Sequence, residues 1–343
     1  MRTDSKVPDS VGLSCYTENL AGYLSARAPD SPDLLARSVR LAVDPLTGGF
    51  SHHDRALNNL PGNLPRGRRL GYRGARDAEA ARTGIGAELA LHDAVLVIAD
   101  SGALPWLSGA ADDHAPHLIM VDGRTPDGNW HVVDGFAALF SGGGSQDPFS
   151  GELSGAEFTA LLAFPCGLSQ VHRTRNSLAF GFPVALPPQE TYQWLVEEEG
   201  TTEEQLPGGS WLTGAAALEE TARLLLADLD GDGSRGVLED VWAATQHHMF
   251  RDAHLLATAG AELSHSERET VDATTAKWRE LPRLLRFAAN SARRGRPRPS
   301  LVSGAFTALA ELEAAASPLH AAHGYGVPTA WPTVASSYGR QER

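Results

Sequence analysis

The sequence contains few cysteines and no long hydrophobic run. Two cysteines in 343 residues cannot form a disulfide framework. No apolar stretch reaches the length of about 18 residues that indicates a membrane-spanning helix, so we expect none. Residues 1–6 also lack the apolar core of a secretory signal. These absences favour a cytoplasmic protein with reduced thiols and no membrane partner.

Positive charge is also scarce. The formal net charge is −13, from 29 basic and 42 acidic side chains, which argues against a nucleic-acid partner. Two arginine-rich segments stand out against this background, one from Arg66 to Arg82 and one from Arg293 to Arg298. Each is typical either of a solvated surface or of a docking patch for an acidic partner.

The hydrophobic pattern predicts an α+β chain. Apolar periodicity and cap signals predict helices over residues 13–27, 31–44 and 76–91, and short apolar runs predict strands over 94–99, 118–121 and 130–133. Residues 45–75, rich in Gly, Pro, Asn and Arg, indicate a long irregular loop. Ser154, with Glu157 three residues later, forms a capping box that predicts the start of a helix of about a dozen residues.

The second half of the chain has a different pattern. From Leu212 to about Leu312, apolar residues recur at helical spacing and strand signals fade. We therefore expect a first domain over residues 1–190, in which a helix packs on an antiparallel sheet, and a helical domain over 205–316. A boundary is predicted in the Pro- and Glu-rich stretch from Leu186 to Gly209. Residues 317–343 are expected to form a surface tail.

Three residues predict nucleophilic chemistry. Cys15 lies at the start of the first predicted helix, where the helix dipole favours a thiolate. His117 begins a strand, and Asp134 ends the next strand of a predicted hairpin, so the two should be neighbours. A Cys–His–Asp triad follows, in which Cys15 attacks, His117 moves the proton and Asp134 orients the imidazole. The order along the chain is that of papain-like enzymes.

Other interpretations remain open from the sequence. Cys15 can be a buried small hydrophobe and His117 an ordinary strand residue. His114 and His131 compete for the role of the base, and Cys166 is interpreted as structural. No glutamine lies just upstream of Cys15 to stabilise an oxyanion, so backbone N–H groups at the helix start, or the side chain of Asn19, are the expected donors.

One acidic segment resembles a calcium-binding loop. Residues 228–239 carry acids at the first, third and fifth positions (Asp228, Asp230, Asp232), Gly233 at the sixth and Glu239 at the twelfth. No second loop of this kind is present, and Arg235 replaces an expected aliphatic residue. We interpret the segment as a turn between two helices and expect no metal. A structural calcium site is the alternative.

Four segments together resemble a known family. They are the early cysteine on a helix, the segment from Asp100 to Leu104-Pro105-Trp106, the strand that His117 begins, and Asp134 after the next strand. In this order and spacing the chain is similar to the butirosin biosynthesis protein H family. That resemblance implies a papain-like domain, like that of bacteriocin-processing peptidases, followed by a helical domain. Ser14 departs from the family, where a histidine often precedes the cysteine.

The resemblance also implies an activity. The expected protein is a cysteine-dependent acyltransferase of antibiotic or other specialised-metabolite biosynthesis. It would move an acyl or aminoacyl group from a carrier-protein thioester, through Cys15, to a small-molecule amine. The carrier's phosphopantetheine thioester is then the donor substrate, and no separate cofactor is expected. A thioesterase, cyclase or cysteine peptidase with the same triad is an alternative, as is a non-catalytic papain-like binding module.

A carrier partner would need a basic surface. Carrier proteins are usually acidic and this chain is acidic too, so docking requires local positive charge. The segment from Arg66 to Arg82 lies between the cysteine helix and the first predicted strand, where a mobile loop could border the cleft. The sequence therefore predicts Arg68, Arg69 and Arg73 as carrier contacts.

Overall fold

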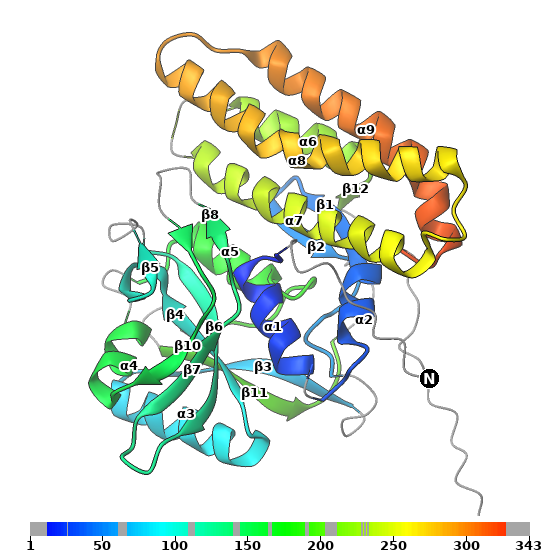
Figure 1. The fold of residues 1–343 in the computed structure, drawn as a ribbon. Coiled ribbons are helices and arrows are strands. Elements are labelled where there is room, and N and C mark those ends of the chain that lie inside the picture. The colour runs from blue at the N-terminus through cyan, green and yellow to red at the C-terminus, as the bar shows by residue number, and fades with distance from the viewer. Residues whose placement is uncertain are drawn as a thin grey trace, which may run out of the picture.

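The computed structural model describes residues 12–25, 27–60, 67–108, 114–139, 145–163, 167–188, 192–202, 211–227, 229, 231 and 233–326, with the side chains of 233–235 excepted. Helices and antiparallel strands both occur in this part of the chain, and the second half is largely helical (Figure 1). The predicted α+β class is therefore confirmed.

The helices are α1 (Cys15–Ser25), α2 (Ser31–Ser38), α3 (Ala78–His92), α4 (Gly155–Leu162), α5 (Gln170–Leu178), α6 (Ala215–Ala227), α7 (Gly233–Ala259), α8 (His265–Arg293) and α9 (Pro299–Ala322), with one 3-10 turn, η1 (Ser101–Ala103). The strands are β1 (Val39–Asp44), β2 (Gly49–His53), β3 (Arg68–Ala75), β4 (Val95–Asp100), β5 (Leu107–Ser108), β6 (Pro116–Arg124), β7 (Trp130–Asp134), β8 (Ala138–Leu139), β9 (Ser145–Gln146), β10 (Phe149–Leu153), β11 (Tyr192–Glu199) and β12 (Leu212–Thr213).

The largest sheet of the described residues is antiparallel, with strand order β10-β7-β6-β4-β11-β3. Its central strand β4 is buried along its whole length, and apolar from Val95 to Ala99, because helices cover both faces. Side chains alternate across a strand, so Leu96 and Ile98 pack with α1, whereas Val95 and Val97 pack with α3 and α4. This arrangement places the N-terminal helix directly against the sheet.

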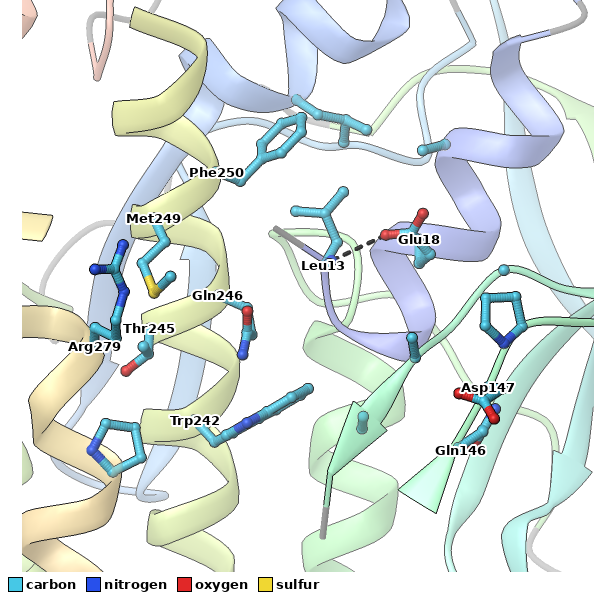
Figure 2. Close-up of a pocket in the computed structure, with 18 of the residues that line it drawn as sticks. Leu13, Glu18, Gln146, Asp147, Trp242, Thr245, Gln246, Met249, Phe250 and Arg279 are labelled. Carbon is cyan, nitrogen blue, oxygen red and sulfur yellow. Dashed lines mark hydrogen bonds between the residues drawn. The ribbon is translucent and has the colours of Figure 1, made fainter. Parts of the chain in front are cut away.

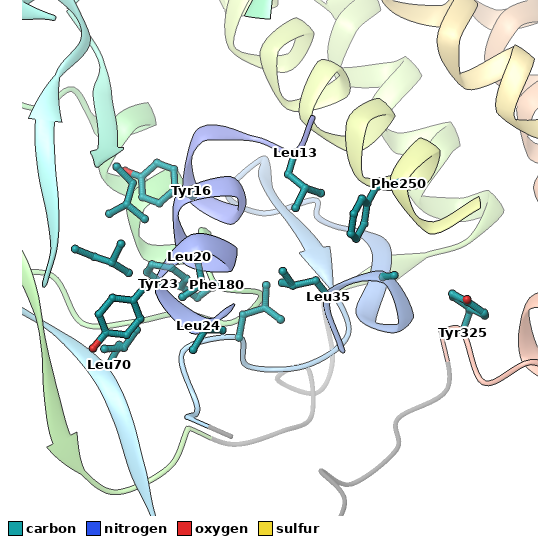
Figure 3. Close-up of a cluster of buried hydrophobic side chains, with 14 of the residues drawn as sticks. Leu13, Tyr16, Leu20, Tyr23, Leu24, Leu35, Leu70, Phe180, Phe250 and Tyr325 are labelled. Atoms are coloured by element: carbon teal, nitrogen blue, oxygen red, sulfur yellow. The ribbon is translucent and has the colours of Figure 1, made fainter. Parts of the chain in front are cut away.

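The helices α6 to α9 pack around a core of their own, which also takes in Leu41 and Val43 of β1. They are not isolated from the first half of the chain. Phe250 and Leu255 of α7 belong to the same buried cluster as Leu20 of α1, and Figure 3 shows Phe250 facing Leu13 at the start of that helix. The helical region therefore packs against the segment that carries Cys15.

Several local predictions are confirmed. The hairpin of β6 and β7 is antiparallel, and α3 lies where a helix was predicted. Ser154 and Glu157 form the predicted capping box, although the helix α4 that follows has 8 residues and not a dozen. Capping and hairpin signals act over a few residues, which is why the sequence alone reveals them.

Other predictions were wrong. The helix predicted over 31–44 ends at Ser38, and the chain continues as β1, where the β-branched Val39 and Val43 pair with β2. The loop predicted over 45–75 contains β2 and β3. Gly and Arg residues concealed β3, because the strand that pairs with it, β11, lies more than a hundred residues later in the chain.

The predicted domain limits also differ from the observed elements. Strand β11 lies inside the predicted boundary stretch and pairs with β3 and β4, so a cut at residue 190 would remove a strand from the sheet. At the other end, α9 continues to Ala322 and Tyr325 is buried in the core, although both lie in the predicted tail. Residues 327–343 lie outside the described part.

Candidate active site

Cys15 is the first residue of α1 and is partly exposed. The N–H of Glu18 donates to the carbonyl oxygen of Ser14 at 2.8 Å, which closes the first helical turn. The N–H groups of Cys15 and Tyr16 precede that turn and have no acceptor inside the helix. A thiol at this position therefore lies at the positive end of the helix dipole, beside unused backbone donors.

His117 lies near the start of β6 and is buried. Met120 of β6 is directly opposite Val133 of β7, so His117 and Asp134 are diagonal neighbours across the hairpin. The ring Nε2 of His117 is 2.7 Å from Oδ2 of Asp134, and the thiol of Cys15 is a second hydrogen-bonding partner of the ring. Because Asp134 occupies Nε2, the other ring nitrogen, Nδ1, is the one left for the thiol. The structure thus brings the three predicted residues together.

The surroundings of His117 favour the imidazolium form. Burial by itself would lower the pKa of His117, but the negative charge available at Cys15 and the hydrogen bond to Asp134 outweigh it and raise the pKa to about 10. The ring then carries a proton at neutral pH. A cation beside a thiol stabilises negative charge on the sulfur, which is the reactive form of cysteine.

Asp134 is fully buried at the centre of a hydrogen-bond network. Burial would raise the pKa of Asp134, but the hydrogen bonds from its neighbours, first among them that of His117, hold the pKa below its usual value. Oδ2 accepts from His117, from Nε1 of Trp106 at 2.9 Å and from Nε2 of Gln146 at 2.6 Å. Oδ1 accepts from Nδ2 of Asn19 at 2.9 Å and from the N–H of Phe136 at 3.1 Å. A carboxylate held in this way stays ionised and fixed.

The oxyanion role predicted for Asn19 is not supported by its contacts. Its Nδ2 donates to the carbonyl oxygen of Leu118 at 2.7 Å and to Asp134, and its Oδ1 accepts from the N–H of Gly135 at 3.0 Å. The amide is thus committed to holding α1 against β6 and β7. Of the two donor types predicted from the sequence, the backbone N–H groups at the start of α1 remain.

Two further residues of the site were not assigned a role from the sequence. Trp106 belongs to the segment that carries the family resemblance, and its ring stacks on Phe149 at 4.0 Å while its N–H binds Asp134. Gln146, on the short strand β9, is buried with its amide on Asp134. Both shield the carboxylate from water. Gln146 carries no recognisable sequence signal, because it follows a glycine-rich stretch and belongs to a strand of only two residues.

The competing histidines have other acidic partners. Nδ1 of His114 is 2.7 Å from Oδ2 of Asp100, and Nδ1 of His131 is 2.5 Å from Oδ1 of Asp122. Cys15 is hydrogen-bonded to the ring of His117. Among the described contacts, neither His114 nor His131 has a hydrogen bond to Cys15. His117 is therefore the histidine placed to serve Cys15. Cys166 lies outside the described residues.

A cleft of about 830 Å³ lies beside these residues, between the N-terminal half and helices α7 and α8. Figure 2 shows Trp242, Gln246 and Met249 projecting from α7 on one side, with Leu13 and Glu18 opposite. Gln146 and Gly135 line the end of the cleft nearest the triad. Cys15 and His117 are not themselves part of its lining, so the cleft adjoins the triad and does not contain it.

The predicted carrier contacts occupy another part of the fold. Arg68, Arg69 and Arg73 lie on β3, at the edge of the sheet and three strands away from β6. Arg69 and Arg73 both pair with Glu198, at 2.9 Å and 2.7 Å, and Arg68 lies 3.5 Å from Glu197. The expectation of a mobile loop that borders the cleft was wrong, because these arginines belong to a strand and pair with acids of β11 across the sheet.

The calcium-loop prediction can be followed only in part. Asp228, Asp230 and Asp232 lie outside the described residues. Glu239 is described, and its carboxylate pairs with Arg175. Helix α7 begins at Gly233, the sixth position of the proposed loop. Glu239, which would be the twelfth ligand, is thus engaged with a cation in the described part of the chain.

The described residues contain neither a cluster of metal ligands nor a membrane-spanning helix. No three His, Cys, Asp or Glu side chains converge there as metal ligands would. None of the helices in that part combines the length and apolarity needed to cross a bilayer.

Fold and site together define an α+β protein with a Cys–His–Asp arrangement at the start of a helix. In the comparisons with known proteins, no family model matches the chain and the search of curated proteins found no match.

The interactions of the His117 imidazolium with Cys15 and Asp134 predict a pH-dependent contribution of His117 to stability. The pKa rises from about 6.5 in the unfolded chain to about 10 in the folded protein, so the contribution is complete below pH 6.5 and is lost as the pH rises towards 10. We expect His117→Gln to lower the free energy of unfolding by at least ~1 kcal/mol more at pH 6 than at pH 9.5, measured by urea denaturation. In a Cys15→Ala background this difference should shrink, and an unchanged difference would contradict the pairing.

Proposed function

We propose that the protein is a cysteine-dependent acyltransferase. Cys15 takes an acyl or aminoacyl group from the phosphopantetheine thioester of a carrier protein and passes it to a small-molecule amine, in the biosynthesis of an antibiotic or another specialised metabolite. The observation that carries the proposal is the contact of His117 with both Cys15 and Asp134. A helix that presents the cysteine against an antiparallel sheet also supports a papain-like fold.

The first half-reaction uses the ion pair. The Cys15 thiolate attacks the thioester carbon, a carbon–sulfur bond forms, and negative charge develops on the carbonyl oxygen. The unused N–H groups at the start of α1 are placed to stabilise that charge. As the tetrahedral intermediate collapses, the bond to the donor sulfur breaks. The His117 imidazolium protonates the departing thiolate, so that acyl-Cys15 and a neutral imidazole remain.

The second half-reaction restores the starting state. The amine attacks the acyl carbon, and neutral His117 accepts the proton that the nitrogen loses. The bond to Cys15 breaks, which releases the amide and regenerates the thiolate beside an imidazolium. Glu18 and Asp147 line the same cleft, and their carboxylates give it an acidic side that suits a cationic amine before it reacts.

A hydrolase or cyclase shares the first half-reaction and differs only in what attacks acyl-Cys15: water, or an amine within the acyl group. A non-catalytic binding module needs neither the contact of Cys15 with His117 nor five hydrogen bonds on Asp134. The arrangement of these residues therefore favours an enzyme over a binding module.

Product analysis separates transfer from hydrolysis. The purified protein is incubated with a carrier-bound acyl thioester, with and without a panel of small amines, and the products are identified by mass spectrometry. We expect amide to form and release of the free acid to fall by at least roughly tenfold at saturating amine, because both acceptors compete for one acyl-enzyme. Free acid released at an unchanged rate would favour the hydrolase.

A further inference from the structure

One wall of the cleft is formed by α8, and it carries three arginines. Arg279, Arg283 and Arg286 all line the cleft. Their spacing of four and then three residues puts them on one face of the helix, over a length of roughly 10 Å. Three arginines therefore line a single side of the cleft beside the triad.

These arginines lack acidic partners in the described part of the chain. No ion pair joins them to a described carboxylate, and Nε of Arg286 donates only to the carbonyl oxygen of Pro282, at 3.2 Å. Arg279 and Arg283 are exposed. Like charges three and four residues apart on a helix repel one another. In a chain of net charge −13, three cations without ion-pair partners on one side of a cleft make that side favourable for an anion.

The helix that carries them is fixed at this point. Pro282 lies between Arg279 and Arg283 and has no N–H to donate to the carbonyl oxygen of Trp278. The hydroxyl of Thr245 on α7 donates to that oxygen instead, at 3.4 Å. Thr245 and Pro282 both line the cleft. This hydrogen bond ties the segment of α8 that carries the arginines to α7.

The rest of the cleft changes character towards the triad. Trp242, Met249 and Phe250 of α7 give it an apolar side, as Figure 2 shows, and its far end is formed by Glu18 and Gln146. Gln146 in turn contacts Asp134. A matching ligand has an anionic head for the arginines, a largely uncharged arm, and a reactive end near Cys15.

We infer that Arg279, Arg283 and Arg286 bind the phosphate of a phosphopantetheine thioester, whose arm runs past Trp242 and Met249 towards Cys15. Guanidinium groups bind phosphate oxygens in pairs, and burial of the arm on apolar side chains adds to the affinity. This inference rests on the proposed function for the thioester, but the recognition of the phosphate is a separate property of α8. It replaces Arg68, Arg69 and Arg73 as the cationic contacts of the donor.

Binding to the Cys15→Ala protein tests the phosphate site without turnover. Isothermal calorimetry compares 4′-phosphopantetheine with pantetheine, which lacks the phosphate. We expect the phosphate to tighten binding by roughly tenfold or more, and the triple variant Arg279→Gln/Arg283→Gln/Arg286→Gln to lose that preference. The control Arg293→Gln/Arg294→Gln/Arg296→Gln removes the same charge beyond the cleft and should keep the preference.

Two results would overturn the inference: equal affinity for the two probes, or equal loss in the triple variant and its control. If the triple variant does not fold, salt provides the second measurement. In the Cys15→Ala protein with all three arginines present, the ratio of affinities for 4′-phosphopantetheine and pantetheine should fall as ionic strength rises, because salt screens the attraction. A preference that is independent of salt would also count against the arginine row.

Acyl donors separate this inference from the proposed function. The triple variant should lose acylation of Cys15 by donors whose pantetheine arm ends in a phosphate group, a phosphodiester in a carrier-bound thioester and a diphosphate in a coenzyme A thioester. It should retain acylation by an N-acetylcysteamine thioester. The faster of the two phosphate donors identifies the natural source. Equal acylation of the triple variant and the unsubstituted protein by all donors would refute the phosphate site and leave the acyltransferase intact. Tighter binding of 4′-phosphopantetheine than of pantetheine, without acylation by any donor, would refute the acyltransferase and leave the phosphate site intact.

Discussion

The mass of the protein is expected to rise by that of one acyl group after incubation with a carrier-bound thioester, and Cys15→Ala is expected to abolish this adduct. Cys15 is the thiol that contacts the His117 imidazolium, so its removal eliminates the nucleophile and lowers turnover by roughly a thousandfold or more. Cys15→Ser should behave almost as Cys15→Ala, because a serine hydroxyl is a far weaker acid than a thiol and therefore a far poorer nucleophile here.

The other cysteine provides the control for this experiment. Cys166→Ala removes the second thiol in the sequence and should keep the adduct and the turnover. Peptide mapping after digestion should place the acyl group on the peptide that contains Cys15. An adduct of equal yield on Cys15→Ala would show that acylation occurs elsewhere and would refute the assignment.

The parts of the site that the sequence reveals are those set by short-range geometry. A cysteine after a serine at the start of an apolar helical pattern is enough to place a thiol at a helix N-terminus. A turn between two short apolar runs is enough to predict the hairpin, and the hairpin makes His117 and Asp134 neighbours. Both inferences depend on periodicity and turn chemistry within about 20 residues of chain.

The parts that the sequence does not reveal depend on contacts between distant segments. Asn19 is a helix residue whose amide could face a substrate or a neighbouring strand, and only the packing of α1 on β6 shows that it holds Asp134. Trp106, just before β5, and Gln146, on β9, reach the same carboxylate. Hydrophobic periodicity carries no information on such polar contacts, because it reports burial and not partners.

Charge was misinterpreted for the same reason. The sequence shows a run of cations at Arg68, Arg69 and Arg73. The acids that pair with them lie more than a hundred residues later, on β11. Arg279 and Arg283 form no run of cations in the sequence, because they are spread along an ordinary amphipathic helix. A cation is available for a ligand only if the fold leaves it without a partner, and the folded structure alone shows which ones those are.

Asp134→Asn is expected to lower kcat by roughly a hundredfold to ten-thousandfold, since the loss of the acid in such triads has effects of this order. The two oxygens of Asp134 accept five hydrogen bonds, three on Oδ2 and two on Oδ1. An amide keeps only one acceptor oxygen, so the donors that face its NH2 group lose their partner. The negative charge that holds the His117 proton also disappears. The pKa of His117 should therefore fall, and the basic limb of the pH–rate profile should move to lower pH.

Asp122→Asn is the matched control for this change. Asp122 also pairs with a histidine of the same hairpin, His131, at 2.5 Å, but that pair is partly exposed and shows no described contact with Cys15. Its kcat and pH–rate profile should stay close to those of the unsubstituted protein. Far-UV circular dichroism and the thermal midpoint would show whether each variant is folded. If a folded Asp134→Asn protein retained the kcat and the basic limb of Asp122→Asn, Asp134 would have no part in holding the proton of His117, and the triad would reduce to a Cys–His pair.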